Sequence, residues 1–113
     1  MRERVLHRAK GIGAHLELLE HKVRIRRKGL LDLATHGFKG DKEILLSRIS
    51  AIQFKDAGLA VNGYIQFTIM GGAEAKGGIW QATADENTVM FNRWQRGAFR
   101  KIKEAIEQRM ITA

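Results

Sequence analysis

The amino-acid sequence predicts a mainly β fold with one C-terminal α-helix. Several short segments alternate apolar and polar residues, which is the two-residue period of a half-buried strand. One segment near the end of the chain instead places apolar residues three or four positions apart, which is the period of a helix. The 113 residues include 12 glycines and no proline, so the turns between strands rely on the tolerance of glycine for positive φ.

The alternation indicates five or six strands. The segments that show it are residues 14–19, 22–28, 42–46, 50–55, 64–69 and 88–91. In the clearest, residues 64–69, every second residue is isoleucine or phenylalanine. Residues 50–55 direct Ile52 and Phe54 to one side, and residues 88–91 form a short final strand. Each strand therefore has one face for a core and one for solvent.

Residues 93–109 change to the helical period. The apolar stripe consists of Phe99, Ile102, Ile106 and Met110, widened by Ala98 and Ala105. Asn92 is a good N-cap, and Gln95 stands where the second residue of a capping box is found. We interpret the stripe as a contact with the core rather than with a partner, because a small sheet needs a covering layer.

Length and composition are typical of one globular domain spanning residues 1–113. Residues 1–10 are expected to form a flexible or loosely packed N-terminal arm. Cysteine is absent, which excludes disulfides, thiolate metal sites and a cysteine nucleophile. The longest apolar runs have three residues, and the N-terminus lacks the apolar core of a secretory signal. We therefore expect a cytoplasmic protein. The alternative is a cytoplasmic protein attached peripherally to the inner face of the membrane.

The net charge of +8 is unevenly distributed. Residues 1–10 carry +3, residues 22–28 carry +5 and residues 93–109 carry +4. Clusters of this kind favour anionic partners, although they also serve solubility.

Residues 22–28 are the sharpest partner signal, because their cations form a ladder without an acidic residue inside the segment. Three interpretations stay open: a solvated outer face, binding of anionic lipid headgroups, and binding of nucleic acid phosphates. Nucleic acid is the least favoured, because exposed aromatic residues for base stacking are scarce. The candidate anion- or lipid-binding residues are Lys22, Arg24, Arg26, Lys28, Lys39 and Lys42.

A loop over residues 29–42 follows the ladder and is rich in leucine. Its candidate apolar anchors for a membrane are Leu30, Leu31 and Phe38. Apolar tips ringed by lysine suit a membrane surface. The alternative is a short helix that plugs one end of the core.

No pattern in the sequence indicates catalysis. The glycine pairs of residues 71–78 lack the spacing and context of a phosphate-binding loop. The four histidines show no metal-ligand spacing, and the neighbouring carboxylates Asp85 and Glu86 have nothing nearby to separate their pKa values. We therefore expect no enzyme activity, no cofactor and no metal.

Several segments in order resemble a small bacterial family of uncharacterised domains with a pleckstrin-homology-like fold. They include Lys22–Gly29, Thr35–Gly40, Ile49–Phe54, Gly63–Phe67, Gly71–Gly72 and Asp85–Val89. The resemblance implies a two-sheet sandwich or partly open barrel of about seven antiparallel strands, capped by the C-terminal helix. It places any additional strand within residues 73–82. The family has no established activity, so the resemblance implies a fold and little mechanism.

We expect a non-catalytic binding or scaffolding module. Its first partner class is another protein or a second copy of the chain, contacted through an exposed edge strand or the loop after Lys28. Attachment to anionic membrane lipid is the first alternative, and nucleic-acid binding the second.

Overall fold

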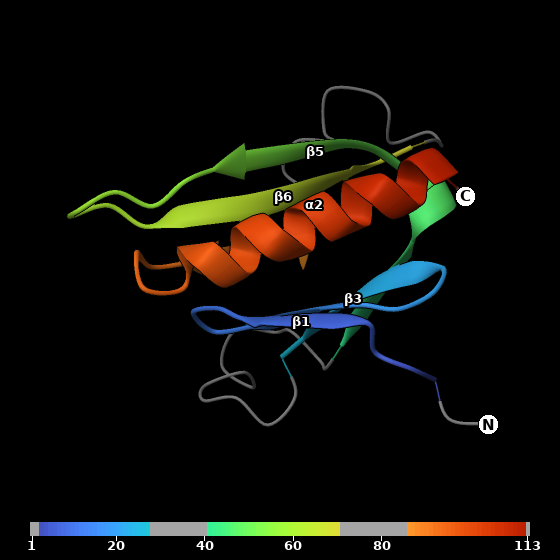
Figure 1. Ribbon diagram of the computed structural model, residues 1–113, viewed down its shortest axis with the longest axis horizontal. Helices are drawn as coiled ribbons and strands as arrows, with labels where there is room; N and C mark the ends of the chain where they lie inside the picture. The colour runs from blue at the N-terminus through green and yellow to red at the C-terminus, as the bar shows by residue number, and fades with distance from the viewer. Residues whose placement is uncertain (1–2, 28–40, 71–85, 113) are drawn as a thin grey trace.

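A computed structural model describes residues 3–27, 41–70 and 86–112 of the chain. In this part of the chain, seven antiparallel strands form two sheets, and one long helix lies against both (Figure 1). The elements in order are β1 (His7–Lys10), β2 (His15–Leu18), β3 (Lys22–Arg26), β4 (Lys42–Leu45), η2 (Leu46–Arg48), β5 (Ile49–Lys55), β6 (Gly63–Ile69), β7 (Thr88–Phe91) and α2 (Arg96–Thr112). The predicted fold class is confirmed.

The strands of each sheet follow one another in chain order. The first sheet has the order β1-β2-β3-β4 and the second has the order β5-β6-β7. The short 3-10 helix η2 carries the chain from one sheet to the other. The sheets do not close into a barrel, but the N–H of Ile12 donates to the carbonyl oxygen of Met90 at 2.7 Å and joins the β1–β2 turn to β7. In that turn Gly13 has a φ of 75°, a conformation that favours glycine.

The core lies between the two sheets and under α2. Phe91 of β7 stacks on Phe99 of α2 with ring centroids 4.5 Å apart, and on Phe54 of β5 at 5.5 Å. Its other main components are Leu16, Leu18, Val23, Ile25, Ile65, Phe67, Val89, Ile102 and Ile106. The apolar stripe predicted for the C-terminal helix is thus a core contact except at Ala98, which is exposed. No helix in the described residues is long and apolar enough to cross a bilayer.

The bounds of β2 to β7 agree with the sequence predictions to within two residues. The helix begins at Arg96 rather than at residue 93 because residues 93–95 form a turn. The predicted capping box opens this turn: Asn92 Oδ1 accepts from the N–H of Gln95, and Gln95 Oε1 accepts from the N–H of Asn92. Asn92 Oδ1 also accepts from the N–H of Trp94, so the two side chains hold this turn together.

The N-terminal segment differs from the expected arm. Residues His7–Lys10 form β1, which pairs in antiparallel register with β2 over its whole length. Ala9 is buried while the other three residues are exposed, so a sequence with one small apolar residue in four gives no alternation to detect. The predicted loop anchors, the glycine pairs and any strand within residues 73–82 lie outside the described residues.

Candidate functional site

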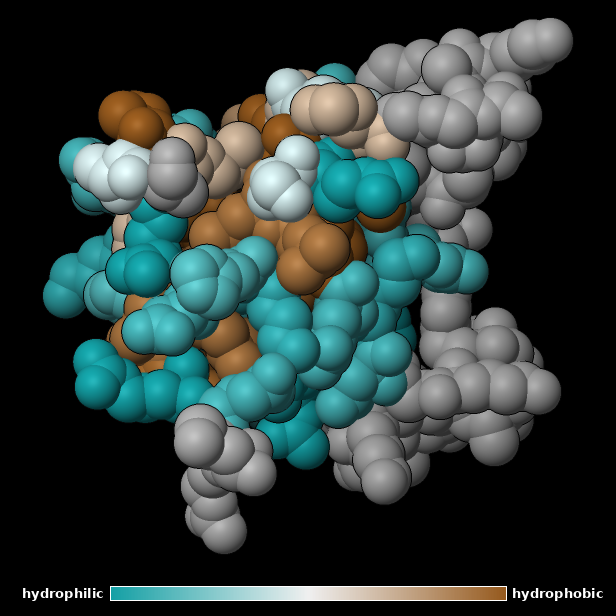
Figure 2. Space-filling view, turned by 90° about the vertical axis from the view of Figure 1, so that its right-hand side faces the viewer, coloured by the Kyte–Doolittle hydropathy of each residue, from teal (hydrophilic) through white to brown (hydrophobic). Residues whose placement is uncertain are grey.

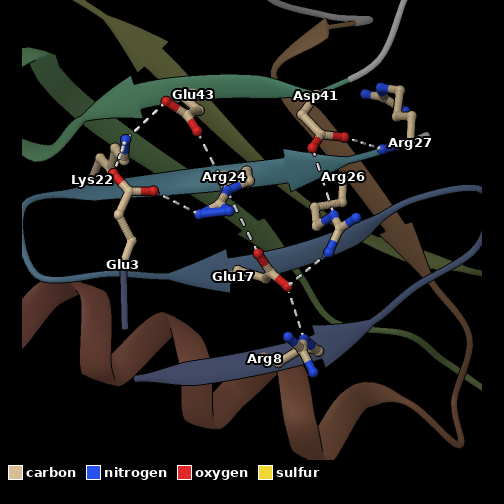
Figure 3. Close-up of polar contacts among 9 residues, drawn as sticks. All are labelled: Glu3, Arg8, Glu17, Lys22, Arg24, Arg26, Arg27, Asp41 and Glu43. Atoms are coloured by element: carbon tan, nitrogen blue, oxygen red, sulfur yellow. Dashed lines mark hydrogen bonds and ion pairs between the residues drawn. The ribbon is translucent and has the colours of Figure 1, made fainter. Parts of the chain in front are cut away.

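The cations of β3 lie on the outer face of the first sheet, where carboxylates from neighbouring segments meet them (Figure 3). Arg24 stands opposite Glu17 of β2 and opposite Glu43 of β4 in the strand register. Val23 and Ile25 point to the other face and are fully buried. The strand alternation thus separates a charged surface from the core.

Glu17 is the centre of this surface and has only 1% of its side chain exposed. Arg8 Nε donates to Glu17 Oε2 at 2.8 Å. Two cations of β3 are slightly further away, with Arg24 Nε 3.6 Å from Oε1 and Arg26 Nη1 3.8 Å from Oε2. One carboxylate therefore joins three guanidinium groups from β1 and β3.

Three further carboxylates complete the arrangement. Glu3 accepts from Lys22 at 2.7 Å and from Arg24 at 3.1 Å. Glu43 lies 2.9 Å from Lys22 Nζ and 3.4 Å from Arg24 Nε. Asp41 lies 3.6 Å from Arg26 Nε. We call the eight residues the ion-pair ladder: Glu3, Arg8, Glu17, Lys22, Arg24, Arg26, Asp41 and Glu43.

Four cations and four carboxylates balance in the ion-pair ladder, so this surface carries no net formal charge. The sequence interpretation counted only the cations of β3, because the carboxylates come from three other segments. The hydrogen bond from Lys22 lowers the pKa of Glu3, and the bonds to Glu3 and Glu43 raise the pKa of Lys22. Both directions favour the charged forms of Glu3 and Lys22.

The other predicted anion-binding residues are placed differently. Lys42 donates to Glu86 at 2.8 Å and is therefore also paired. Arg27 was not among the predicted anion-binding residues. It is 9% exposed and donates to the carbonyl oxygens of Glu86 and Thr88. These contacts tie the end of β3 to the start of β7. Lys28, Lys39, Leu30, Leu31 and Phe38 lie outside the described residues.

Residues 20–107 match the family model described as a domain of unknown function, DUF4429. The chain belongs to the DUF4429 family. The match covers more than half of the sequence and includes β3 to β7 and most of α2. The comparisons give no match among curated proteins and none among solved structures.

The DUF4429 domain has a hollow of about 500 Å³ beside the ion-pair ladder. Its lining residues are Glu3, Arg4, Leu19, Glu20, His21, Lys22 and Leu45. Figure 2 views the molecule from this end and shows apolar side chains at the surface among hydrophilic ones. Within the described residues, no group of three or more histidine, aspartate or glutamate side chains could hold a metal ion.

His15, at the edge of the ion-pair ladder, is expected to make the stability of the DUF4429 domain depend on pH. Burial lowers its pKa, and Lys10, Arg8 and Arg26 add to the effect, while Glu17 opposes it. The unfolded chain therefore binds the proton more readily than the folded protein. We expect the free energy of unfolding to be highest above the ordinary histidine pKa of about 6.5 and to decrease as the pH falls below it.

Urea unfolding at about pH 7.5 and pH 5.5 measures this dependence. His15→Gln is expected to remove part of the decrease, whereas His7→Gln, at an exposed position of β1, should retain the wild-type decrease. An identical decrease in wild type and His15→Gln would show that His15 does not contribute.

Proposed function

We propose that the DUF4429 domain is a non-catalytic binding module that acts through protein–protein interaction or self-assembly. The observation that carries the proposal is the outer edge of β5, with which no strand pairs in the part of the chain that the structure describes. We also infer membership of a bacterial lineage of domains with a pleckstrin-homology-like fold. Two antiparallel sheets with a C-terminal helix across them are consistent with such a sandwich.

The β5 edge is long and nearly uncharged. β5 has seven residues, lies at the edge of its sheet and pairs with β6 on one side. In the described residues no strand pairs with its other side, and in Figure 1 it forms the outermost strand of the upper sheet. Edge strands are usually protected by charges, proline or short length. β5 has one charge, Lys55 at its end, and no proline, and its register with β6 is regular from Ala51 to Lys55 after a shift between Ile49 and Ala51. Its unpaired backbone groups can therefore accept another strand.

Two β5 strands can pair with each other around a two-fold axis. An antiparallel pair centred on Ile52 overlaps all seven residues and places Ala51 of one copy opposite Gln53 of the other. Both of these side chains are exposed. The two Lys55 ammonium groups would be separated by six residues along the strands, which is about 20 Å. This exceeds the Debye length of about 10 Å in 0.1 M salt, so charge repulsion is small.

The ion pairs reduce the support for the alternative of lipid attachment through the basic strand. Lys22, Arg24 and Arg26 already have carboxylate partners. An anionic headgroup would have to compete with them. The same competition applies to nucleic acid phosphates.

Light scattering after size-exclusion chromatography tests self-assembly through β5. The wild-type domain is expected to exceed the monomer mass of 12.8 kDa as its concentration rises. The double variant Ala51→Lys/Gln53→Lys places like charges opposite each other twice and should remain monomeric. Ala51→Glu/Gln53→Lys places opposite charges across the same pairs and should restore the larger species.

Ala51→Thr/Gln53→Thr is the neutral control, because threonine favours strands. It is expected to behave as wild type. A wild-type protein that stays at the monomer mass up to about millimolar concentration, or a double-lysine variant that still assembles, would overturn the self-assembly proposal.

A further inference from the structure

A second surface lies at the end of the molecule where three connections come together. These are the β1–β2 turn, the β5–β6 connection and the segment between β7 and α2, all at the left of Figure 1. Five large apolar side chains on these segments and on the adjoining end of β7 are exposed. They are Ile12 at 44%, Leu59 at 86%, Val61 at 58%, Met90 at 44% and Trp94 at 78%. We call this surface the Trp94 end.

Hydrogen bonds hold the three connections in place. Ile12 is bonded to Met90 through the backbone. Arg96 Nη1 donates to the carbonyl oxygen of Ala57 at 3.0 Å and attaches the start of α2 to the β5–β6 connection. Arg100 Nε adds a bond to Asp56 Oδ2 at 2.9 Å. The apolar side chains are thus presented by a connected framework.

The charge of the Trp94 end contrasts with that of the ion-pair ladder. Lys10 and Arg93 are exposed, and neither has a carboxylate partner among the described residues. The Arg93 guanidinium lies over the Trp94 ring, 4.5 Å from its centroid. Lys10 and Trp94 line the same hollow of about 470 Å³. The carboxylate of Asp56 is already engaged by Arg100. Two cations without a carboxylate partner among the described residues, Lys10 and Arg93, therefore lie beside Trp94.

We propose that the Trp94 end contacts the surface of an anionic lipid bilayer. A tryptophan with aliphatic neighbours suits the interface between headgroups and acyl chains, where its ring is amphipathic. The free cations are placed to meet lipid phosphates. This contact is independent of β5 and uses none of the ion-pair ladder.

The chemistry of the Trp94 end favours an anionic bilayer over other partners. Single-stranded nucleic acid is bound by aromatic stacking, but four of the five exposed apolar residues here are aliphatic or methionine. A second copy docked at the same end would bring unneutralised cations against cations. An anionic bilayer complements both the apolar and the positive character of the surface.

Vesicle co-sedimentation and tryptophan fluorescence test the proposal. The full chain in a Trp80→Phe background has Trp94 as its sole tryptophan. Vesicles of phosphatidylcholine with about one third phosphatidylglycerol should sediment the protein in about 0.1 M salt and shift its emission to the blue. Pure phosphatidylcholine vesicles should bind it at least about tenfold more weakly.

Matched variants assign the contact to this end. Leu59→Ser/Trp94→Ser in the full chain with Trp80 retained should weaken vesicle binding at least about tenfold. Ile111→Ser, equally exposed at 77% near the other end of α2, should not change it. Lys10→Gln and Arg93→Gln should each weaken binding about fivefold, whereas Arg48→Gln in η2 should have little effect.

Three outcomes would overturn the proposal. They are no sedimentation with anionic vesicles at low salt, binding that Leu59→Ser/Trp94→Ser leaves unchanged, and Trp94-dependent binding to single-stranded DNA without binding to vesicles. Because the β5 variants change assembly in solution and the Trp94 variants change vesicle binding, the two proposals can fail separately.

Discussion

Replacing Glu17 by glutamine is expected to lower the free energy of unfolding by about 3 kcal/mol. The carboxylate has 1% of its side chain exposed and lies within 4 Å of Arg8, Arg24 and Arg26. Glutamine has nearly the same shape but no charge, so the change isolates electrostatics from packing. Removal of a buried charge from an ion-pair network leaves its partners less well compensated. Arg24 keeps Glu3 and Glu43 as partners, and Arg26 keeps Asp41. Arg8 loses the carboxylate to which it donates.

Urea unfolding of Glu17→Gln beside Glu43→Gln measures this effect. Glu43 contacts Lys22 and Arg24 as well, but 45% of its side chain is exposed. Exposed ion pairs contribute about 0–1 kcal/mol, so Glu43→Gln should lower the free energy of unfolding by less than about 1 kcal/mol. Equal losses for both variants would contradict the central role of Glu17.

Replacing Phe91 by alanine is expected to lower the free energy of unfolding by about 3–5 kcal/mol. The ring is fully buried and contacts Phe54 and Phe99. Its loss would leave a cavity where β5, β7 and α2 meet. Phe91→Leu fills part of that space and should cause an intermediate loss.

Trp94→Ala is the control for the core prediction. Trp94 is larger than Phe91 and lies three residues further along the chain, yet it is 78% exposed. The free energy of unfolding should change by no more than about 0.5 kcal/mol. A loss comparable to that of Phe91→Ala would mean that Trp94 packs into the fold and is not free for a partner.

The sequence predicted the fold well where one face of a segment is apolar. In β6 the residues Ile65 and Phe67 are fully buried, as the alternation predicts, although Gln66 between them is also buried. The helix was predicted equally well from the sequence, because Phe99, Ile102 and Ile106 lie on one stripe and are all buried.

The candidate site was less predictable because it depends on pairing between strands. Glu17 is 7 residues from Arg24 in the sequence, and Glu43 is 19 residues from it. The register of β2, β3 and β4 brings all three together. A count of charges within β3 cannot include partners on other strands. Trp94 was missed for another reason: nothing in its local pattern separates an exposed tryptophan from a buried one.

The ion-pair ladder also has a consequence for how the four strands of its sheet align. A shift of β3 by one residue would turn Lys22, Arg24 and Arg26 into the core and expose Val23 and Ile25. A shift by two residues would keep the apolar face buried and would set Lys22 or Arg26, in place of Arg24, opposite Glu17 and Glu43. The charges and the hydrophobic pattern therefore both oppose a shift by one residue. A surface that first suggested binding to something else thus helps to determine which face of β3 meets the protein's own core.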